Sequence, residues 1–151
     1  MNRTIASLLF AGGLLPACAA AAQDAPTPGD APTPGHCPQL PADAGLAWES
    51  RAMGDADFCR ALRSDGSEVF GLYISPEPNF QPSSRNREES GQVDGHEVTW
   101  YRAEVATNPG VQSRETLLQL ADGRYAHIWL QSGSAEGLAT GYRLVAQLRF
   151  R

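Results

Sequence analysis

Three Asp-Gly pairs divide the chain after residue 46, at residues 65–66, 94–95 and 122–123. Asp-Gly is typical of the tight turns that join antiparallel strands, because these turns need a positive φ that glycine adopts without steric cost. Between the turns, apolar and polar residues alternate with a period of two, which is the period of a strand with one buried face. The pattern therefore predicts an antiparallel sheet built from hairpins.

We expect four to six strands in this sheet. The clearest hairpin has its turn at residues 64–67, and the strand at the start of the domain has the weakest pattern. The expected strands lie at residues 46–51, 58–63, 68–75, 97–105, 116–120 and 125–131. Residues 76–91 are predicted to form a long, proline-containing loop whose one large apolar residue, Phe80, either packs back on the domain or contacts a partner.

The last part of the chain changes period. Between residues 135 and 148, apolar side chains recur every three or four positions, as Leu138, Tyr142 and Val145 do, and this spacing predicts a helix. A sheet with one apolar face requires a cover for that face. The predicted fold class is therefore α+β, with the antiparallel sheet covered on one face by the C-terminal helix.

The beginning of the chain has the order of a secretory signal peptide. Residues 1–22 contain one basic residue, Arg3, then an apolar run from Ile5 to Leu15, and then small residues. The apolar run is shorter than the about 20 residues that a bilayer-spanning helix needs. Export is therefore expected, with residues 1–22 as signal peptide, residues 23–41 as linker and residues 42–151 as a single globular domain.

Within this leader, Leu15-Pro16-Ala17-Cys18 resembles the lipobox of Gram-negative envelope lipoproteins. The resemblance implies that Cys18 becomes diacylated and forms the new N-terminus. Ala19, which follows this cysteine, is similar to the residue found there in lipoproteins sorted to the outer membrane. Ala20-Ala21-Ala22 equally matches an ordinary signal peptidase site, which would leave a soluble protein beginning at Gln23. Both alternatives place the protein in the periplasm, either free or on the periplasmic face of the outer membrane.

A tandem repeat of Asp-Ala-Pro-Thr-Pro-Gly follows, at residues 24–29 and 30–35. Its paired prolines favour the extended polyproline II conformation, so we expect a semi-rigid spacer. Cys37 and Cys59 can form one disulfide in an oxidising compartment. Closing a loop of about 22 residues stabilises the fold by roughly 3 kcal/mol in the chain-entropy model.

Charge and motifs exclude several classes of function. The net charge is −5, and all 12 basic residues are arginine without a basic run, so nucleic-acid and anionic-membrane binding have no electrostatic support. Membrane association is expected only through an N-terminal lipid anchor. The chain contains no HExxH, GxSxG, phosphate-binding glycine loop or acidic calcium loop. We therefore predict no catalytic residue, metal site or cofactor.

One face of the predicted sheet carries aromatic side chains instead of aliphatic ones. Alternation along residues 125–131 separates Ala126, Ile128 and Leu130 from the aromatic set. The predicted binding residues on the aromatic face are Tyr73, Trp100, Arg102, Tyr125, His127 and Trp129. Aromatic residues and arginine are enriched at protein interfaces.

The sequence thus leads to two functional hypotheses. The first is an exported, non-enzymatic envelope protein that binds another protein, as an inhibitor, an immunity factor or an assembly accessory. The alternative is a small envelope hydrolase that uses His127 or His96 together with a nearby carboxylate.

Overall fold

A computed structural model describes residues 36–103 and 110–151. The expected signal peptide, both cleavage sites, Cys18 and the tandem repeat lie outside the described residues. The described elements are β1 (Ala47–Met53), β2 (Ala56–Leu62), β3 (Glu68–Ser75), the 3₁₀ helix η1 (Ser84–Asn86), β4 (Arg87–Val93), β5 (His96–Arg102), β6 (Gln112–Gln119), β7 (Tyr125–Ser132) and the helix α1 (Ala135–Ala146).

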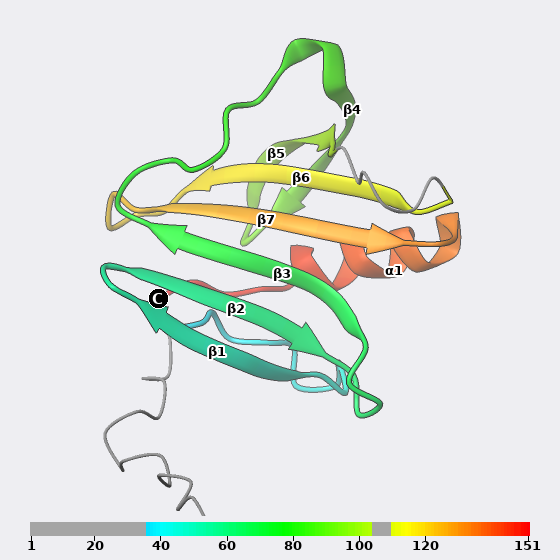
Figure 1. The fold of residues 1–151 in the computed structure, drawn as a ribbon, viewed down its shortest axis with the longest axis horizontal. Coiled ribbons are helices and arrows are strands. Elements are labelled where there is room, and N and C mark those ends of the chain that lie inside the picture. Colours follow the sequence, from blue (N-terminus) through cyan, green and yellow to red (C-terminus); the bar gives the residue numbers. More distant parts are fainter. Residues whose placement is uncertain (1–35, 104–109) are drawn as a thin grey trace, which may run out of the picture. The chain divides into compact units, whose positions relative to one another are not determined.

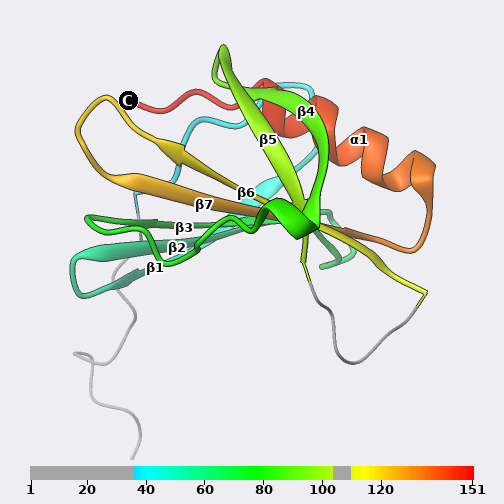
Figure 2. The ribbon, with the colours of Figure 1, turned by 90° about the horizontal axis from the view of Figure 1, so that it is seen from above.

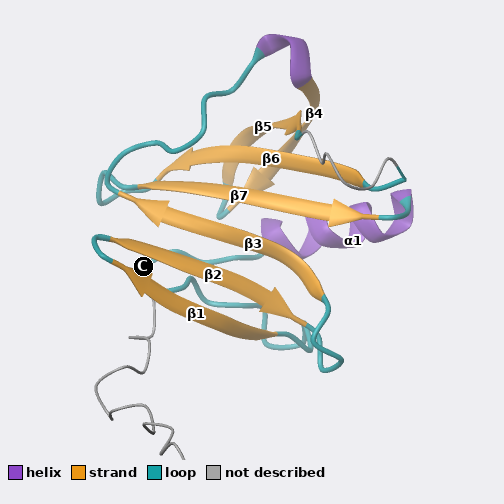
Figure 3. Ribbon diagram, viewed as in Figure 1, coloured by secondary structure: helices purple, strands orange, loops and turns teal. Residues whose placement is uncertain are grey.

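All seven strands form one antiparallel sheet in the order β1-β2-β3-β7-β6-β5-β4 (Figures 1 and 3). The predicted mostly antiparallel sheet is confirmed, with seven strands in place of the expected four to six. Long connections separate β3 from β4 and β5 from β6, while the other neighbours along the chain are joined as hairpins or short turns. The first and last positions in the sheet are the edge strands β1 and β4.

The additional strand is β4, which the sequence pattern assigned to the long loop. Its sequence, Arg-Glu-Glu-Ser-Gly-Gln-Val, lacks alternating apolar residues, but it pairs with β5 across the turn at Asp94-Gly95. Both turn residues have positive φ, 49° and 77°, as a type I′ turn requires. The charged side chains of β4 suit a sheet edge, where they discourage pairing with another chain. The connection between β3 and β4 is therefore shorter than predicted.

The helix α1 covers one face of the sheet, as predicted (Figure 2). Ser134 caps its N-terminus by accepting a hydrogen bond from the backbone N–H of Gly137. Gly141 brings the helix close to β7, because a Cβ at this position would lie 3.1 Å from Leu130. The core beneath the helix includes Phe70, Leu72, Ile74, Ile128, Leu130, Val145 and Leu148, all at most 1% exposed. Among the described residues, no helix has the length and apolar character needed to cross a membrane.

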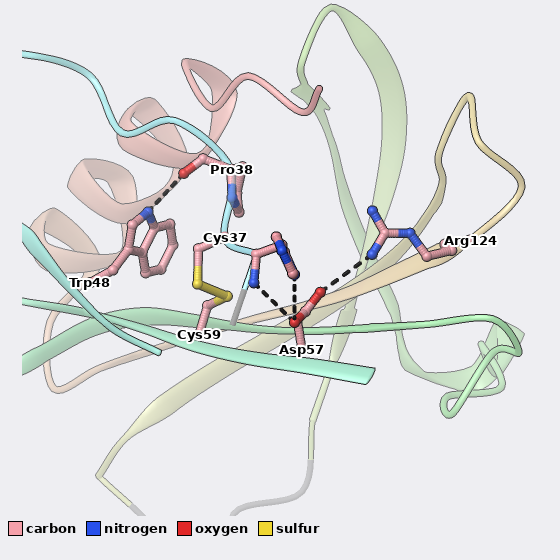
Figure 4. Close-up of a disulfide and its surroundings, with 7 residues drawn as sticks. Cys37, Pro38, Trp48, Asp57, Cys59 and Arg124 are labelled. Carbon is pink, nitrogen blue, oxygen red and sulfur yellow. Dashed lines mark hydrogen bonds and ion pairs between the residues drawn. A yellow bond between two sulfur atoms is a disulfide. The ribbon is translucent and has the colours of Figure 1, made fainter. Parts of the chain in front are cut away.

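The segment that precedes β1 is fixed to the helix-covered face of the sheet. The predicted Cys37–Cys59 disulfide joins it to β2, and the indole N–H of Trp48 donates a hydrogen bond of 2.7 Å to the carbonyl of Pro38 (Figure 4). The carboxylate of Asp57 accepts from the backbone N–H of His36 and pairs with Arg124 at 3.3 Å. These contacts complete the core where α1 does not reach.

Candidate functional site

The face of the sheet opposite α1, which we call the outer face, is formed by the alternate residues of each strand that point away from the core. Residues that pair directly across neighbouring strands form two adjacent rows on this face. The first row contains Glu49, Arg60, Gly71, Trp129, Glu115 and Tyr101. The second row contains Arg51, Phe58, Tyr73, His127 and Leu117. The outer face therefore collects aromatic and charged side chains from six strands.

Four of the six predicted binding residues belong to the outer face. Tyr73, Tyr125, His127 and Trp129 alternate with the buried aliphatic residues of β3 and β7, and all four are half-buried. Their placement follows from the period of two that the sequence shows. The remaining two residues lie elsewhere.

Trp100 and Arg102 are on the helix-covered face, contrary to the predicted placement. Trp100 is 1% exposed and its ring packs against Tyr142 of α1 at a centroid distance of 5.0 Å. Arg102 follows it by two residues, so it points to the same face, where it pairs with Glu88 at 3.5 Å. The reason is that Val98 and Trp100 together supply the apolar face of β5. Tyr101, which the sequence analysis did not select, takes the outward position.

The indole of Trp129 lies flat across the neighbouring strand. Trp129 pairs directly with Gly71, and a Cβ at Gly71 would lie 2.2 Å from the indole ring. Beyond Gly71 the indole reaches Phe58 of β2, with ring centroids 5.7 Å apart and an interplanar angle of 30°. A glycine inside a strand often marks such a close approach. Gly71 thus allows aromatic rings from β2 and β7 to stack across β3.

Charged residues fix the position of this stacked pair. The indole N–H of Trp129 donates to Glu68 at 2.9 Å, and the other carboxylate oxygen of Glu68 accepts from Arg60 at 2.8 Å. Arg60 also pairs with Glu49 at 3.2 Å. Charge-assisted hydrogen bonds of this kind restrict the side chains that they join. The indole is therefore held in one orientation before any partner binds.

His127 is at the centre of a second cluster on the outer face. Its Nε2 lies 3.0 Å from a carboxylate oxygen of Glu115, and Phe80 stacks on its ring at 4.9 Å with an interplanar angle of 14°. Phe80 also contacts Tyr101 edge-on at 6.0 Å. The connection between β3 and β4 thus folds back over the sheet, which is one of the two outcomes expected for Phe80.

Burial changes the proton affinity of this histidine. Burial beneath Phe80 lowers the pKa of His127, and the hydrogen bond and charge of Glu115 only partly oppose that effect. The folded protein therefore binds a proton at His127 less readily than the unfolded chain, whose histidine has a pKa of about 6.5. Neutral His127 is the preferred form at physiological pH.

We expect acid to destabilise the fold through His127. As the pH falls below about 6.5, the unfolded chain takes up the proton first, so the free energy of unfolding decreases until the pH passes the lowered pKa of the folded state. Urea unfolding at a series of pH values measures this decrease. The His127→Gln variant lacks the titrating group and should lose less stability over the same window. Equal pH dependence of the wild type and the variant would contradict the conclusion that burial lowers the pKa of His127.

The part of the outer face that Phe80 leaves open is hollowed. One depression is lined by Glu49, Ser50, Arg51, Phe58 and Arg60, and a second by Phe58, Glu68, Val69, Trp129 and Gln131. A third adjoins Tyr73, at the start of the connection to β4. Phe58 borders the first two depressions. The open part of the outer face therefore offers polar-rimmed recesses around aromatic rings.

His96 and His127 are the two histidines that the hydrolase alternative would use. Among the described residues, no carboxylate lies within hydrogen-bond distance of His96, at the end of the β4–β5 turn. His127 has Glu115 as a partner but lines none of the three depressions described above. No group of three or more potential metal-ligating side chains occurs within residues 36–103 and 110–151.

A separate ionic cluster lies beneath the end of α1. The hydroxyl of Tyr142 donates to Glu89, which also accepts from Arg114 at 3.2 Å. Burial by itself would raise the pKa of Glu89, but the hydrogen bonds from Tyr142 and Arg114 outweigh it and hold that pKa below its usual value. Burial and the neighbouring carboxylate raise the pKa of Tyr142. This cluster joins α1 to the edge strand β4.

Several residues of the outer face were not identified from the sequence: Phe58, Arg60, Glu68, Gly71, Tyr101 and Glu115. Gly71 could have been noticed, because a glycine inside a strand often marks a close approach of another group. The glutamates gave no signal, because their roles depend on which strands pair. No protein-family model, curated protein or solved structure matches the chain.

Proposed function

We propose that this chain is an exported, non-enzymatic envelope protein that binds another protein through the open part of its outer face. The observation that carries the proposal is the stacked Phe58–Trp129 pair, bordered by Tyr73 and by the charged residues Arg60 and Glu68. Tryptophan, tyrosine and arginine dominate the binding energy of protein interfaces. Here they adjoin recesses that can accept side chains of a partner.

The rigidity of these rings favours protein binding. Trp129 is held by Glu68 on one side and by Phe58 on the other, so it loses little rotational freedom when a partner covers it. The polar rim contributes hydrogen-bonding groups at the border of the aromatic area, which is the usual arrangement in protein interfaces. A protein surface is therefore the ligand class that we infer.

The Tyr73→Ala variant tests this proposal. Partner proteins are first captured from an envelope extract with the mature wild-type protein and identified, and their affinity is then measured by calorimetry. We expect Tyr73→Ala to weaken binding at least tenfold, about 1.4 kcal/mol, because a half-buried aromatic anchor is lost. The free energy of unfolding should change much less than it does for a core variant.

The matched control is Gln147→Ala, which alters an exposed side chain on the helix-covered side. It should leave the affinity unchanged. Equal affinity of wild type, Tyr73→Ala and Gln147→Ala would show that the partner binds elsewhere. A loss caused by Gln147→Ala alone would move the binding surface to the helix.

One observation favours the alternative of a small envelope hydrolase, namely the 3.0 Å contact between His127 and Glu115. In that case His127→Ala should abolish turnover of a substrate while the protein still folds. In a binding protein the same change should remove at most part of the affinity. Phe80 stacks on the imidazole, so a hydrolase would also require access that the stacked ring restricts.

Export and anchoring form part of the proposal and have a separate test. The intact mass of the mature protein is measured in membrane and soluble envelope fractions. A membrane-bound species beginning at a diacylated Cys18 would establish the lipid anchor, and a soluble species beginning near Gln23 would establish a free periplasmic or secreted protein. A full-length chain with its leader retained would contradict export.

A further inference from the structure

The edge strand β1 presents backbone groups that no described residue binds. Its pairing with β2 is continuous from Ala47↔Leu62 to Met53↔Ala56, with the two-residue turn Gly54-Asp55 at the end. The pair that closes such a turn exchanges backbone hydrogen bonds, and the pairs then alternate. The N–H and C=O groups of Trp48, Ser50 and Ala52 therefore point away from β2. No hydrogen bond to them occurs among the described residues.

The other edge of the sheet is protected in the ways that proteins commonly use. The pairing of β4 with β5 shifts between Arg87 and Ser90, and the strand carries Glu88 and Glu89. The helix α1 also contacts β4. Bulges, charges and a covering helix discourage addition of another strand. The strand β1 has neither a bulge nor a proline, and its two charged residues, Glu49 and Arg51, have opposite signs, so it remains competent to pair.

The sequence of β1 is complementary to itself in the antiparallel direction. With a two-fold axis at Ser50, each Glu49 stands opposite Arg51 of the second copy, and each Trp48 stands opposite Ala52. At the ends, the large Met53 stands opposite the small Ala47. Both members of the charged pair point to the outer face, so their side chains meet on the same side of the joined sheet.

The local environment leaves these groups available. Arg51 is exposed, and its guanidinium has no ion-pair or hydrogen-bond partner among residues 36–103 and 110–151. The side chain of Glu49 is 54% exposed, and its neighbour Arg60 keeps a second carboxylate partner in Glu68. Met53 is 50% exposed and is the one large hydrophobic residue of the described chain that is this accessible.

We propose that β1 is a dimerisation strand that pairs antiparallel with β1 of a second copy of this chain, centred on Ser50. The outward backbone groups of Trp48, Ser50 and Ala52 then complete a ladder between the two copies. The Glu49–Arg51 pairs fall at positions without backbone hydrogen bonds, where opposite side chains are closest. Dimerisation brings the two outer faces into one continuous surface.

Charge reversal at β1 tests the proposal. The mature wild-type protein should sediment as a concentration-dependent dimer in analytical ultracentrifugation. Arg51→Glu places like charges opposite each other twice, so the dissociation constant of the dimer should rise at least tenfold. Glu49→Arg should have the same effect. Arg85→Glu makes the same charge change in η1, away from β1, and should leave the dimer intact.

Mixing the two charge-reversed β1 variants provides the decisive test. In a mixed dimer, every reversed charge faces its opposite, so Arg51→Glu and Glu49→Arg should associate with each other although neither associates with itself. Ser50→Pro removes an outward N–H without breaking the β1–β2 ladder and should abolish association while circular dichroism remains native. A monomeric wild type, a dimer unaffected by Arg51→Glu, or no association in the mixture would each overturn the proposal.

Discussion

Replacing Trp100 with alanine should lower the free energy of unfolding by about 3–5 kcal/mol, the range found when a large buried aromatic residue is truncated. Trp100 is 1% exposed and packs between the sheet and Tyr142 of α1. Its indole occupies space beside Gly91, where a Cβ would lie 2.5 Å from the indole nitrogen. The cavity left by alanine would therefore lie between α1 and the strands β4 and β5.

Urea unfolding followed by circular dichroism measures this loss. The control is Met53→Ala, which truncates a residue that is 50% exposed and should change stability by at most about 0.5 kcal/mol. If Trp100 instead lay on the outer face, as the sequence analysis expected, the two variants would differ much less. A small effect of Trp100→Ala would contradict its burial beneath α1.

Removing the disulfide should have a comparable effect. The bond joins the segment before β1 to the fully buried Cys59 and closes a loop with a sequence separation of 22 residues. In the chain-entropy model such a loop contributes about 3 kcal/mol, because the cross-link restricts the unfolded chain. We therefore expect the double variant Cys37→Ala/Cys59→Ala to unfold at clearly lower urea concentration.

A reductant distinguishes this effect from the loss of side-chain packing. Wild type in dithiothreitol should lose about the same free energy as the double variant, whereas the double variant should not respond to the reductant. Unchanged stability of the wild type after complete reduction, verified by thiol titration, would show that the cross-link contributes nothing. Destabilisation of the variant alone would assign the effect to packing at Cys59.

The hairpins could be predicted because their signals are local. The turn at Asp122-Gly123 and the alternation in residues 125–131 specify a strand, its turn and its two faces without knowledge of other strands. The helix was also predictable from its three-to-four spacing, although it contains Gly141 and glycine has a low helix propensity. The structure explains that glycine, because it allows α1 to approach Leu130 closely.

The remaining features depend on contacts that are distant in the chain. The strand β4 has no apolar alternation of its own and is defined by its pairing with β5. Glu68 and Glu115 become part of the outer face only because β3 pairs with β7 and β7 with β6. Trp100 was placed on the wrong face although Val98, two residues before it, indicated the apolar side of β5.

The claim that the outer face binds a protein partner is tested most directly by site-specific photo-cross-linking in the intact envelope. A benzophenone amino acid replaces the half-buried Tyr73 on the outer face in one protein and the exposed Gln147, just after α1, in another. We predict that irradiation gives a discrete cross-linked product from position 73 and none from position 147. No product from position 73, or the same product from both positions, would contradict the account.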